Sequence, residues 1–188
     1  MRKTESILKS QKRSWLIRLR TKHPDADNFD AIVLANHKKH ILLAVEDSFE
    51  FGSLVALPKK WITSCRDGKY EKCQNQIIRT NNQLGKFKSP DWLIEASSVE
   101  IILIQMQKRN IWPVIETIDQ IVGPEASSLY IGPILEVTKH GVVIDYYDAA
   151  GKWEKAYSLP LTDIFKIEFK DRYSKHFNSY MKKHTKNR

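Results

Sequence analysis

The chain has 188 residues, with 31 Lys and Arg against 22 Asp and Glu, and a formal net charge of +9. Apolar residues make up 41%, too many for a disordered chain and enough for one domain or two small ones. The seven glycines are never within two residues of one another, which excludes glycine-rich phosphate loops. Two cysteines exclude a disulfide framework and a four-thiolate zinc site. We therefore expect no cofactor and no metal.

The sequence predicts a cytoplasmic protein without membrane insertion. No apolar run of signal-peptide length follows the basic start, because Leu8 leads into Lys9, Gln11, Lys12 and Arg13. No stretch approaches the ~18 apolar residues of a spanning helix. Cys65 and Cys73 are expected to be reduced thiols, with a bridge between them as the alternative.

The positive charge is concentrated at the two ends. Residues 1–23 carry +7 and residues 170–188 carry +6, so the body between them is mildly acidic. We assign 1–13 as a basic N-terminal segment and 184–188 as a basic tail. Such ends either keep a protein soluble or contact phosphate through salt-sensitive electrostatics.

In the first half, apolar Trp15, Ile17 and Leu19 alternate with Arg18 and Arg20, which predicts a half-buried strand. Further strands are expected at 29–36, 40–46, 53–57 and 61–65. An amphipathic helix follows, since its apolar positions fall at helical spacing: Tyr70, Cys73, Ile77 and Ile78. Residues 14–80 are therefore assigned to a first domain, and the polar range 81–96 to a linker.

The second domain, 97–183, is expected to begin with a helix through about Lys108. Ser97 and Glu100 have the spacing of a capping box, although the apolar run after them also suits a strand. Strands are expected at 111–118, 130–137, 141–147, 153–158 and 163–169. A closing helix is predicted from the spacing of Tyr173, Phe177, Tyr180 and Met181.

A weak internal duplication predicts the fold. Phe29–Leu34 matches Tyr130–Leu135, a Leu-Pro-x-x-x-Ile pattern occurs at both 57–62 and 159–164, and Tyr70 matches Tyr173. Five short antiparallel strands commonly close into a small barrel, which leaves no exposed sheet edge. The predicted fold is mainly β with α additions: two tandem five-stranded antiparallel β-barrels, Sm-like or Src-homology-3-like, each followed by an amphipathic helix.

The stretch from Phe29 to Tyr70 resembles a group of uncharacterised bacterial proteins. The second half resembles the same group through Tyr130-Ile131-Gly132, the hairpin at Trp153 and the range 164–173. That resemblance covers about 120 residues and implies two tandem small barrels of Sm-like type. It implies no activity and no catalytic residue.

Four side-chain groups were weighed as chemical sites and each is better explained structurally. His37 and His40 lack a third metal ligand. Cys73 and His176, a possible nucleophile and base, occupy matching positions of the expected repeat and are more simply two core positions. The stretch 23–30 lacks the glycine and glutamate of a calcium loop. The remaining group is acidic, without glycosidase spacing: Asp145, Asp148, Glu154 and Asp163. We therefore predict no catalytic residue and no enzyme.

The predicted function is a non-catalytic binding or scaffold module, most simply for a protein partner. The alternatives are a nucleic-acid-binding protein that uses the basic ends and strand aromatics, and an enzyme with a pocket between the repeats. Because Tyr146 and Tyr147 are adjacent on one strand, they point to opposite faces. The candidate binding surface comprises Lys9, Lys12, Arg13, Arg18, Arg20, Tyr146, Tyr147, Lys152, Trp153, Lys182 and Lys183.

Overall fold

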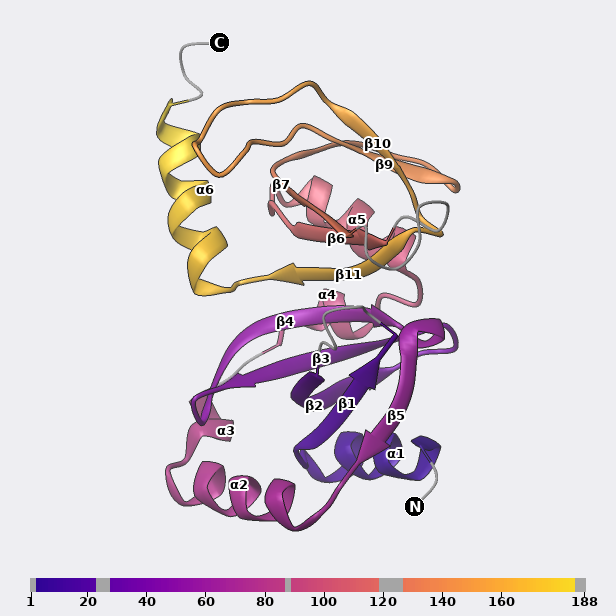
Figure 1. Cartoon of the computed structure of the whole chain (residues 1–188), viewed down its shortest axis with the longest axis vertical. Helices are drawn as coiled ribbons and strands as arrows, with labels where there is room; N and C mark the ends of the chain where they lie inside the picture. The colour runs from indigo at the N-terminus through magenta and orange to yellow at the C-terminus, as the bar shows by residue number, and fades with distance from the viewer. Residues whose placement is uncertain (1–2, 23–27, 87–88, 119–126, 185–188) are drawn as a thin grey trace. The chain divides into compact units, whose positions relative to one another are not determined.

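A computed structural model describes residues 3–22, 28–86, 89–118 and 127–184. The chain divides into two compact units, Met1–Ser98 and Val99–Arg188. Each unit contains helices, antiparallel strands and its own buried residues (Figure 1). The protein is therefore of the α+β class.

The first unit is built on five antiparallel strands, paired in the order β5-β1-β2-β3-β4. Strands β3 and β4 are buried over most of their length, which accounts for the unbroken apolar runs at 41–45 and 54–57. The strand bounds are β1 (Ile17–Thr21), β2 (Asn28–Asn36), β3 (His40–Asp47), β4 (Glu50–Pro58) and β5 (Ile62–Arg66). The short 3-10 helix η1 (Lys59–Trp61) joins β4 to β5.

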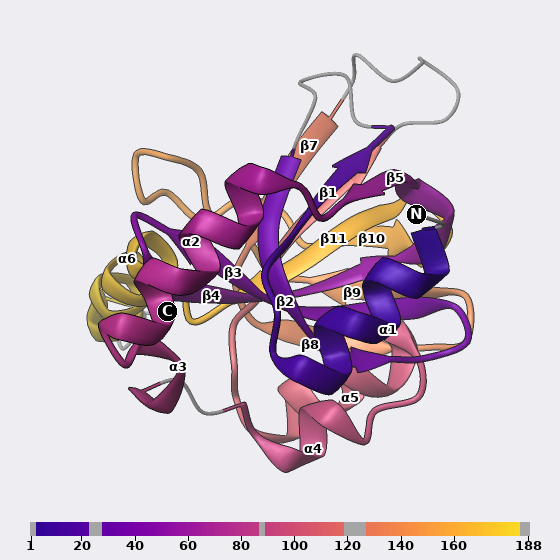
Figure 2. The ribbon, with the colours of Figure 1, turned by 90° about the horizontal axis from the view of Figure 1, so that it is seen from below.

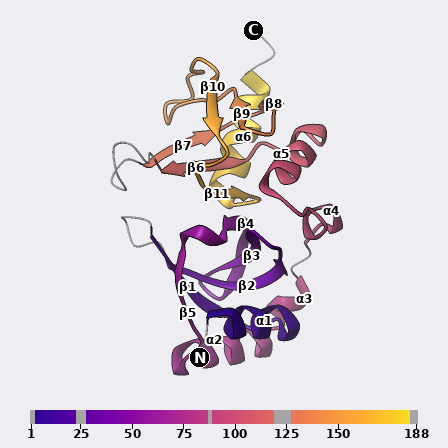
Figure 3. The ribbon, with the colours of Figure 1, turned by 90° about the vertical axis from the view of Figure 1, so that its right-hand side faces the viewer.

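Helices α1 (Lys3–Arg13) and α2 (Lys69–Thr80) lie on one side of this sheet (Figures 2 and 3). Helix α1 buries Ile7, and its Ser10 hydroxyl accepts a hydrogen bond of 2.9 Å from the Val33 backbone N–H of β2. The segment 3–13, expected only as a basic end, is thus a packed helix. The range 81–96, expected as a linker, contains two short helices, α3 (Gln83–Lys86) and α4 (Asp91–Ile94).

The second unit begins with α5 (Val99–Lys108), which confirms the helical interpretation of this run over the strand alternative. Its strands pair as β11-β6-β7 and as β10-β9-β8. Their bounds are β6 (Val114–Ile118), β7 (Ser127–Ile131), β8 (Ile134–Val137), β9 (Gly141–Ile144), β10 (Tyr157–Pro160) and β11 (Ile164–Phe169). The closing helix α6 (Arg172–His184) stands along one side of this unit (Figure 1).

The prediction of two closed barrels is wrong. Within the described part of the first unit, β5 and β4 are the outer strands of the order and no backbone pairing joins them. Closure was inferred from the number of strands alone. An alternating pattern identifies a strand but carries no signal of which edge strands will pair.

The prediction of a tandem repeat is also wrong. The expected strand 130–137 was matched to the single strand β2, but it breaks at Gly132-Pro133 into β7 and β8, which belong to different sheets. Pro133 has no N–H to donate to a ladder. A Cβ at Gly132 would lie 2.0 Å from the carbonyl oxygen of Asp145, so the chain there needs a glycine.

Among the residues described, no helix is long and apolar enough to cross a membrane.

Candidate functional site

A basic hollow of about 530 Å³ lies between the two long helices of the first unit. We call it the α1–α2 hollow. Its walls are Lys9 and Arg13 of α1, Trp15 just after that helix, and four residues of α2: Lys72, Gln76, Arg79 and Thr80. The α2 residues follow at intervals of four, three and one, so they share one face of the helix. The lining therefore brings four cations together with one aromatic ring.

Two of the lining residues, Trp15 and Lys9, contact the buried carboxylate of Asp67. The Trp15 indole N–H donates to Asp67 Oδ1 at 2.9 Å, and Lys9 forms an ion pair with the other oxygen of the same carboxylate. The Asp67 side chain is 1% exposed. Burial opposes its ionisation, but the hydrogen bonds from Lys9 and Trp15 outweigh burial and lower the pKa of Asp67 below its ordinary value.

Two of the four cations are further ordered by contact with the aromatic ring. Lys9 Nζ lies 5.0 Å from the ring centre of Trp15, and Arg79 Cζ lies 5.6 Å from it, both within range of a cation–π interaction. Arg79 also donates from Nη2 to the backbone carbonyl of Arg13 at 2.9 Å, which links α2 to the end of α1. Arg13, Lys72 and Arg79 are all exposed.

No acidic side chain is among the described residues that line the α1–α2 hollow. Asp67 neutralises one positive charge through its ion pair with Lys9, so the hollow keeps a surplus of positive charge. Exposed cations at fixed positions attract an anionic ligand and release its counterions.

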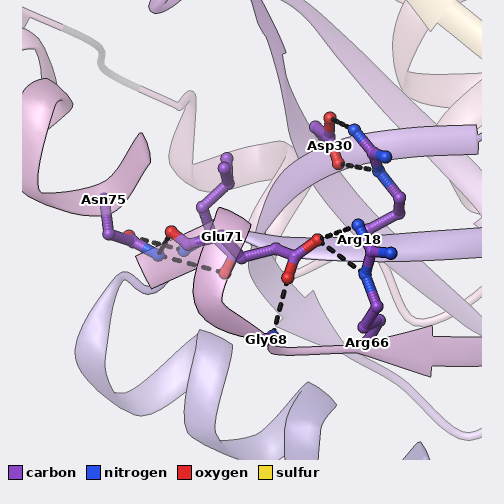
Figure 4. A network of polar contacts seen from close by, with 7 residues as sticks. Arg18, Asp30, Arg66, Gly68, Glu71 and Asn75 are labelled. Atoms are coloured by element: carbon purple, nitrogen blue, oxygen red, sulfur yellow. Dashed lines mark hydrogen bonds and ion pairs between the residues drawn. The ribbon is translucent and has the colours of Figure 1, made fainter. Parts of the chain in front are cut away.

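Buried polar contacts fix α2 in place beside β5 (Figure 4). Glu71, which is fully buried, accepts hydrogen bonds from Arg66 Nη2 at 2.7 Å and from the Gly68 backbone N–H at 2.6 Å. Burial opposes the ionisation of Glu71, but these two donors prevail and lower its pKa. Asn75, one turn further along α2, accepts from the Leu16 N–H at 2.8 Å. The basic face of α2 is therefore held rigidly.

The predicted surface residues of the first unit have different surroundings. Lys9 and Arg13 line the α1–α2 hollow, whereas Lys12 and Arg20 are exposed outside it. Arg18 donates from Nε to Asp30 at 2.7 Å (Figure 4), and this pairing raises the pKa of its guanidinium. Its charge is thereby largely neutralised.

In the second unit, two of the predicted residues are structural. Tyr147 is buried and donates its hydroxyl proton to Asn178 Oδ1 at 2.7 Å, and burial raises the pKa of that hydroxyl. Trp153 packs edge-on against Tyr147, with ring centres 5.7 Å apart. Tyr146 is half-buried, and its ring centre lies 5.1 Å from that of Tyr130.

The predicted lysines of the second unit are exposed: Lys152, Lys182 and Lys183. Lys182 Nζ lies 4.6 Å above the ring of Trp112 and donates to the Asn110 carbonyl. Partial burial there lowers the pKa of Lys182.

Sequence reasoning missed Trp15, Lys72, Gln76 and Arg79 as site residues. Trp15 was assigned to a strand because it alternates with Ile17 and Leu19, but β1 begins only at Ile17. The signal for the others was present in the spacing of Lys72 and Arg79, two helical turns apart and opposite the apolar stripe of α2.

The rejected chemical sites are also placed by the structure. The rings of His37 and His40 stack with centres 4.6 Å apart, and Cys73 and His176 are each exposed in different units. Across the described parts of the chain, no group of three or more His, Cys, Asp or Glu side chains could hold a metal ion. The stretch 23–30, considered as a calcium loop, and the predicted basic tail 184–188 both lie largely outside the described residues; His184 is the last residue of α6.

No protein-family model, no curated protein and no solved structure matches this chain. The resemblance to a group of uncharacterised bacterial proteins stays a prediction, without the two barrels that it implied.

Proposed function

We propose that the protein is a nucleic-acid-binding module that contacts the phosphate backbone through the α1–α2 hollow. The supporting observation is the convergence of Lys9, Arg13, Lys72 and Arg79 around Trp15, with one buried carboxylate in contact with Lys9. Cations within reach of successive phosphates supply the sequence-independent part of nucleic-acid affinity.

The mechanism is preorganisation. Lys9 is held by Asp67 and by the Trp15 ring, and Arg79 by the same ring and the Arg13 carbonyl. Flexible lysine and arginine side chains lose rotamer entropy when a ligand orders them, so cations ordered beforehand bind phosphate at a lower entropic cost. Contacts with phosphate carry no information about the bases, so we expect binding without strong sequence preference.

The test is fluorescence anisotropy with a labelled oligouridine and a random DNA duplex. The variant Arg13→Gln/Lys72→Gln removes two exposed cations of the hollow. Its control, Lys38→Gln/Lys39→Gln, removes two exposed lysines from the β2–β3 turn of the same unit and lowers the net charge equally. We expect the first variant to bind both probes about tenfold more weakly at moderate salt and the control to bind as the wild type does. Equal weakening in the two variants would contradict the proposal.

A protein partner is the second candidate function. Its support is a set of large apolar side chains exposed in the second unit, namely Leu129 at 54%, Leu135 at 51% and Tyr157 at 50%. Exposed apolar groups of this size are typical of interaction surfaces when they are contiguous. A complex that survives high salt and is lost in Leu135→Ser would support this candidate. A complex unaffected by that change would exclude this surface.

A further inference from the structure

We propose that the exposed aromatic face of α6 is a stacking platform for the bases of a single-stranded nucleic acid. We call Tyr173, Phe177 and Tyr180 the α6 aromatic face. This inference rests on the proposed function and adds to it a preference for single strands over duplexes, carried by residues of the second unit.

The α6 aromatic face is continuous along the helix. Tyr173, Phe177 and Tyr180 follow at intervals of four and three residues, so their rings lie on one side of α6. The ring centres of Tyr173 and Phe177 are 5.6 Å apart, and those of Phe177 and Tyr180 are 6.4 Å apart. Tyr180 also stacks on His184 with 4.1 Å between the ring centres. These contacts place four rings in a row.

This face is open to ligand. Tyr173 is 59% exposed and Tyr180 is 53% exposed. Both border a hollow of about 580 Å³, whose other lining residues are Ala149, Arg172, His176 and Phe177. The wall formed by the β9–β10 loop is held close to α6, since a Cβ at Gly151 would lie 3.5 Å from Met181 Sδ.

The exposure does not come from a loosely attached helix. The neighbouring side of α6 buries Ser174 and Met181. Asn178 accepts the hydroxyl proton of Tyr147 at 2.7 Å and donates to the Trp112 carbonyl. The rings of Tyr173 and Tyr180 are therefore presented to solvent from an anchored helix, and Phe177 between them is half-buried against the core.

The charged residues of α6 indicate what kind of ligand suits the α6 aromatic face. Within its bounds α6 carries four lysine and arginine residues and no acidic residue: Arg172, Lys175, Lys182 and Lys183. Asp171, just before the helix, accepts a hydrogen bond of 2.7 Å from the Ser174 N–H. Aromatic rings on a helix that also carries cations match a ligand that offers flat rings and phosphates together. A duplex hides its base faces, so the fitting ligand is a single strand.

The test compares oligouridine RNA with a DNA duplex in anisotropy titrations. Tyr173→Ala/Tyr180→Ala removes the two most exposed rings, and Tyr173→Phe/Tyr180→Phe keeps them. Tyr157→Ala removes an exposed ring of the same unit from another surface. We expect the alanine pair to weaken oligouridine binding about thirtyfold or more, with duplex binding unchanged. The phenylalanine pair and Tyr157→Ala should bind oligouridine as the wild type does.

The outcomes separate this inference from the proposed function. If the wild type binds both probes and the alanine pair keeps full oligouridine affinity while melting as the wild type does, the stacking platform is overturned and phosphate binding stands. If the phenylalanine pair loses as much as the alanine pair, stacking is also overturned. If the wild type binds neither probe even at low salt, both proposals fail.

Discussion

Trp15 and Asp67 are joined by a hydrogen bond of 2.9 Å from the indole N–H to Oδ1, and Lys9 binds the other carboxylate oxygen. The contacts that keep this buried carboxylate ionised also hold Lys9, one of the cations of the α1–α2 hollow, in place. Asp67 lies at the end of β5, so the contact ties the sheet to α1.

Trp15→Phe keeps an aromatic ring but removes the N–H donor to Asp67. A buried acceptor that loses a partner costs about 1–3 kcal/mol. We therefore expect the free energy of unfolding to fall by about that amount in urea denaturation. Stability equal to the wild type would show that the hydrogen bond does not anchor Asp67.

Glu71→Gln should destabilise the first unit near neutral pH, because it removes a fully buried carboxylate that Arg66 and the Gly68 N–H stabilise. Breaking a buried pair costs about 3–5 kcal/mol, and the half-exposed Arg66 reduces that to about 2 kcal/mol. The folded-state pKa of Glu71 is lowered, so this stabilisation exists above the unfolded-state pKa and disappears as pH falls through the folded-state pKa. The difference between variant and wild type should shrink in acid, measured by denaturation across pH. A constant difference would contradict the role of the charge.

The buried His40 predicts a second loss of stability in acid. Glu71 is stabilised in its charged form, whereas burial of His40 disfavours its charged form. Burial, with a smaller contribution from the adjacent His37, lowers its pKa to about 4. The unfolded state takes up a proton near pH 6.5 that the folded state refuses, so stability is lost as pH falls from about 6.5 towards 4. The slope should approach ~1.4 kcal/mol per pH unit in that window. His40→Phe should flatten this slope, whereas His140→Gln, at an exposed histidine, should leave the slope unchanged. A slope that persists in His40→Phe would exclude His40 as the cause.

Gly132→Ala should strongly destabilise the second unit. The new Cβ would lie 2.0 Å from the Asp145 carbonyl oxygen, so the backbone between β7 and β8 must move. We expect a loss of about 3 kcal/mol or more in thermal denaturation, at the upper end for single substitutions. Gly52→Ala is the matched control, since its nearest non-local heavy atom would be 3.9 Å away. Equal melting of the two variants would contradict this account of the strand break.

Local features of the fold could be predicted from the sequence, whereas the pairing of distant elements could not. Runs of apolar residues located β2 and β3, and apolar residues at helical spacing located α2 and α6. Of the residues that gave the helical spacing, only Ile78 and Met181 are buried. Helix α1 was missed because it has no stripe of buried apolar residues: its buried residues are Ile7 and two serines, Ser6 and Ser10. Barrel closure and the repeat failed because edge pairing depends on contacts far apart in the chain.

The residues of the candidate site could likewise be predicted only where a local pattern marks them. Lys9 and Arg13 could be selected from the excess of charge near the N-terminus. Their association with Lys72 and Arg79 depends on the packing of α1 against the sheet beside α2, which no local pattern reports. Conversely, Tyr147 and Trp153 were selected as surface aromatics, but Tyr147 is buried and Trp153 is half-buried against its cluster.

The most direct test of phosphate binding at the α1–α2 hollow is the salt dependence of oligouridine affinity. For single strands, the slope of log affinity against log salt changes by about 0.7 for each phosphate contact. Arg13→Gln/Lys72→Gln should therefore reduce the slope by about 1.4 relative to the wild type, whereas Lys38→Gln/Lys39→Gln should keep the wild-type slope. A slope unchanged in the first variant, or reduced equally in both, would contradict a phosphate-binding site at this hollow.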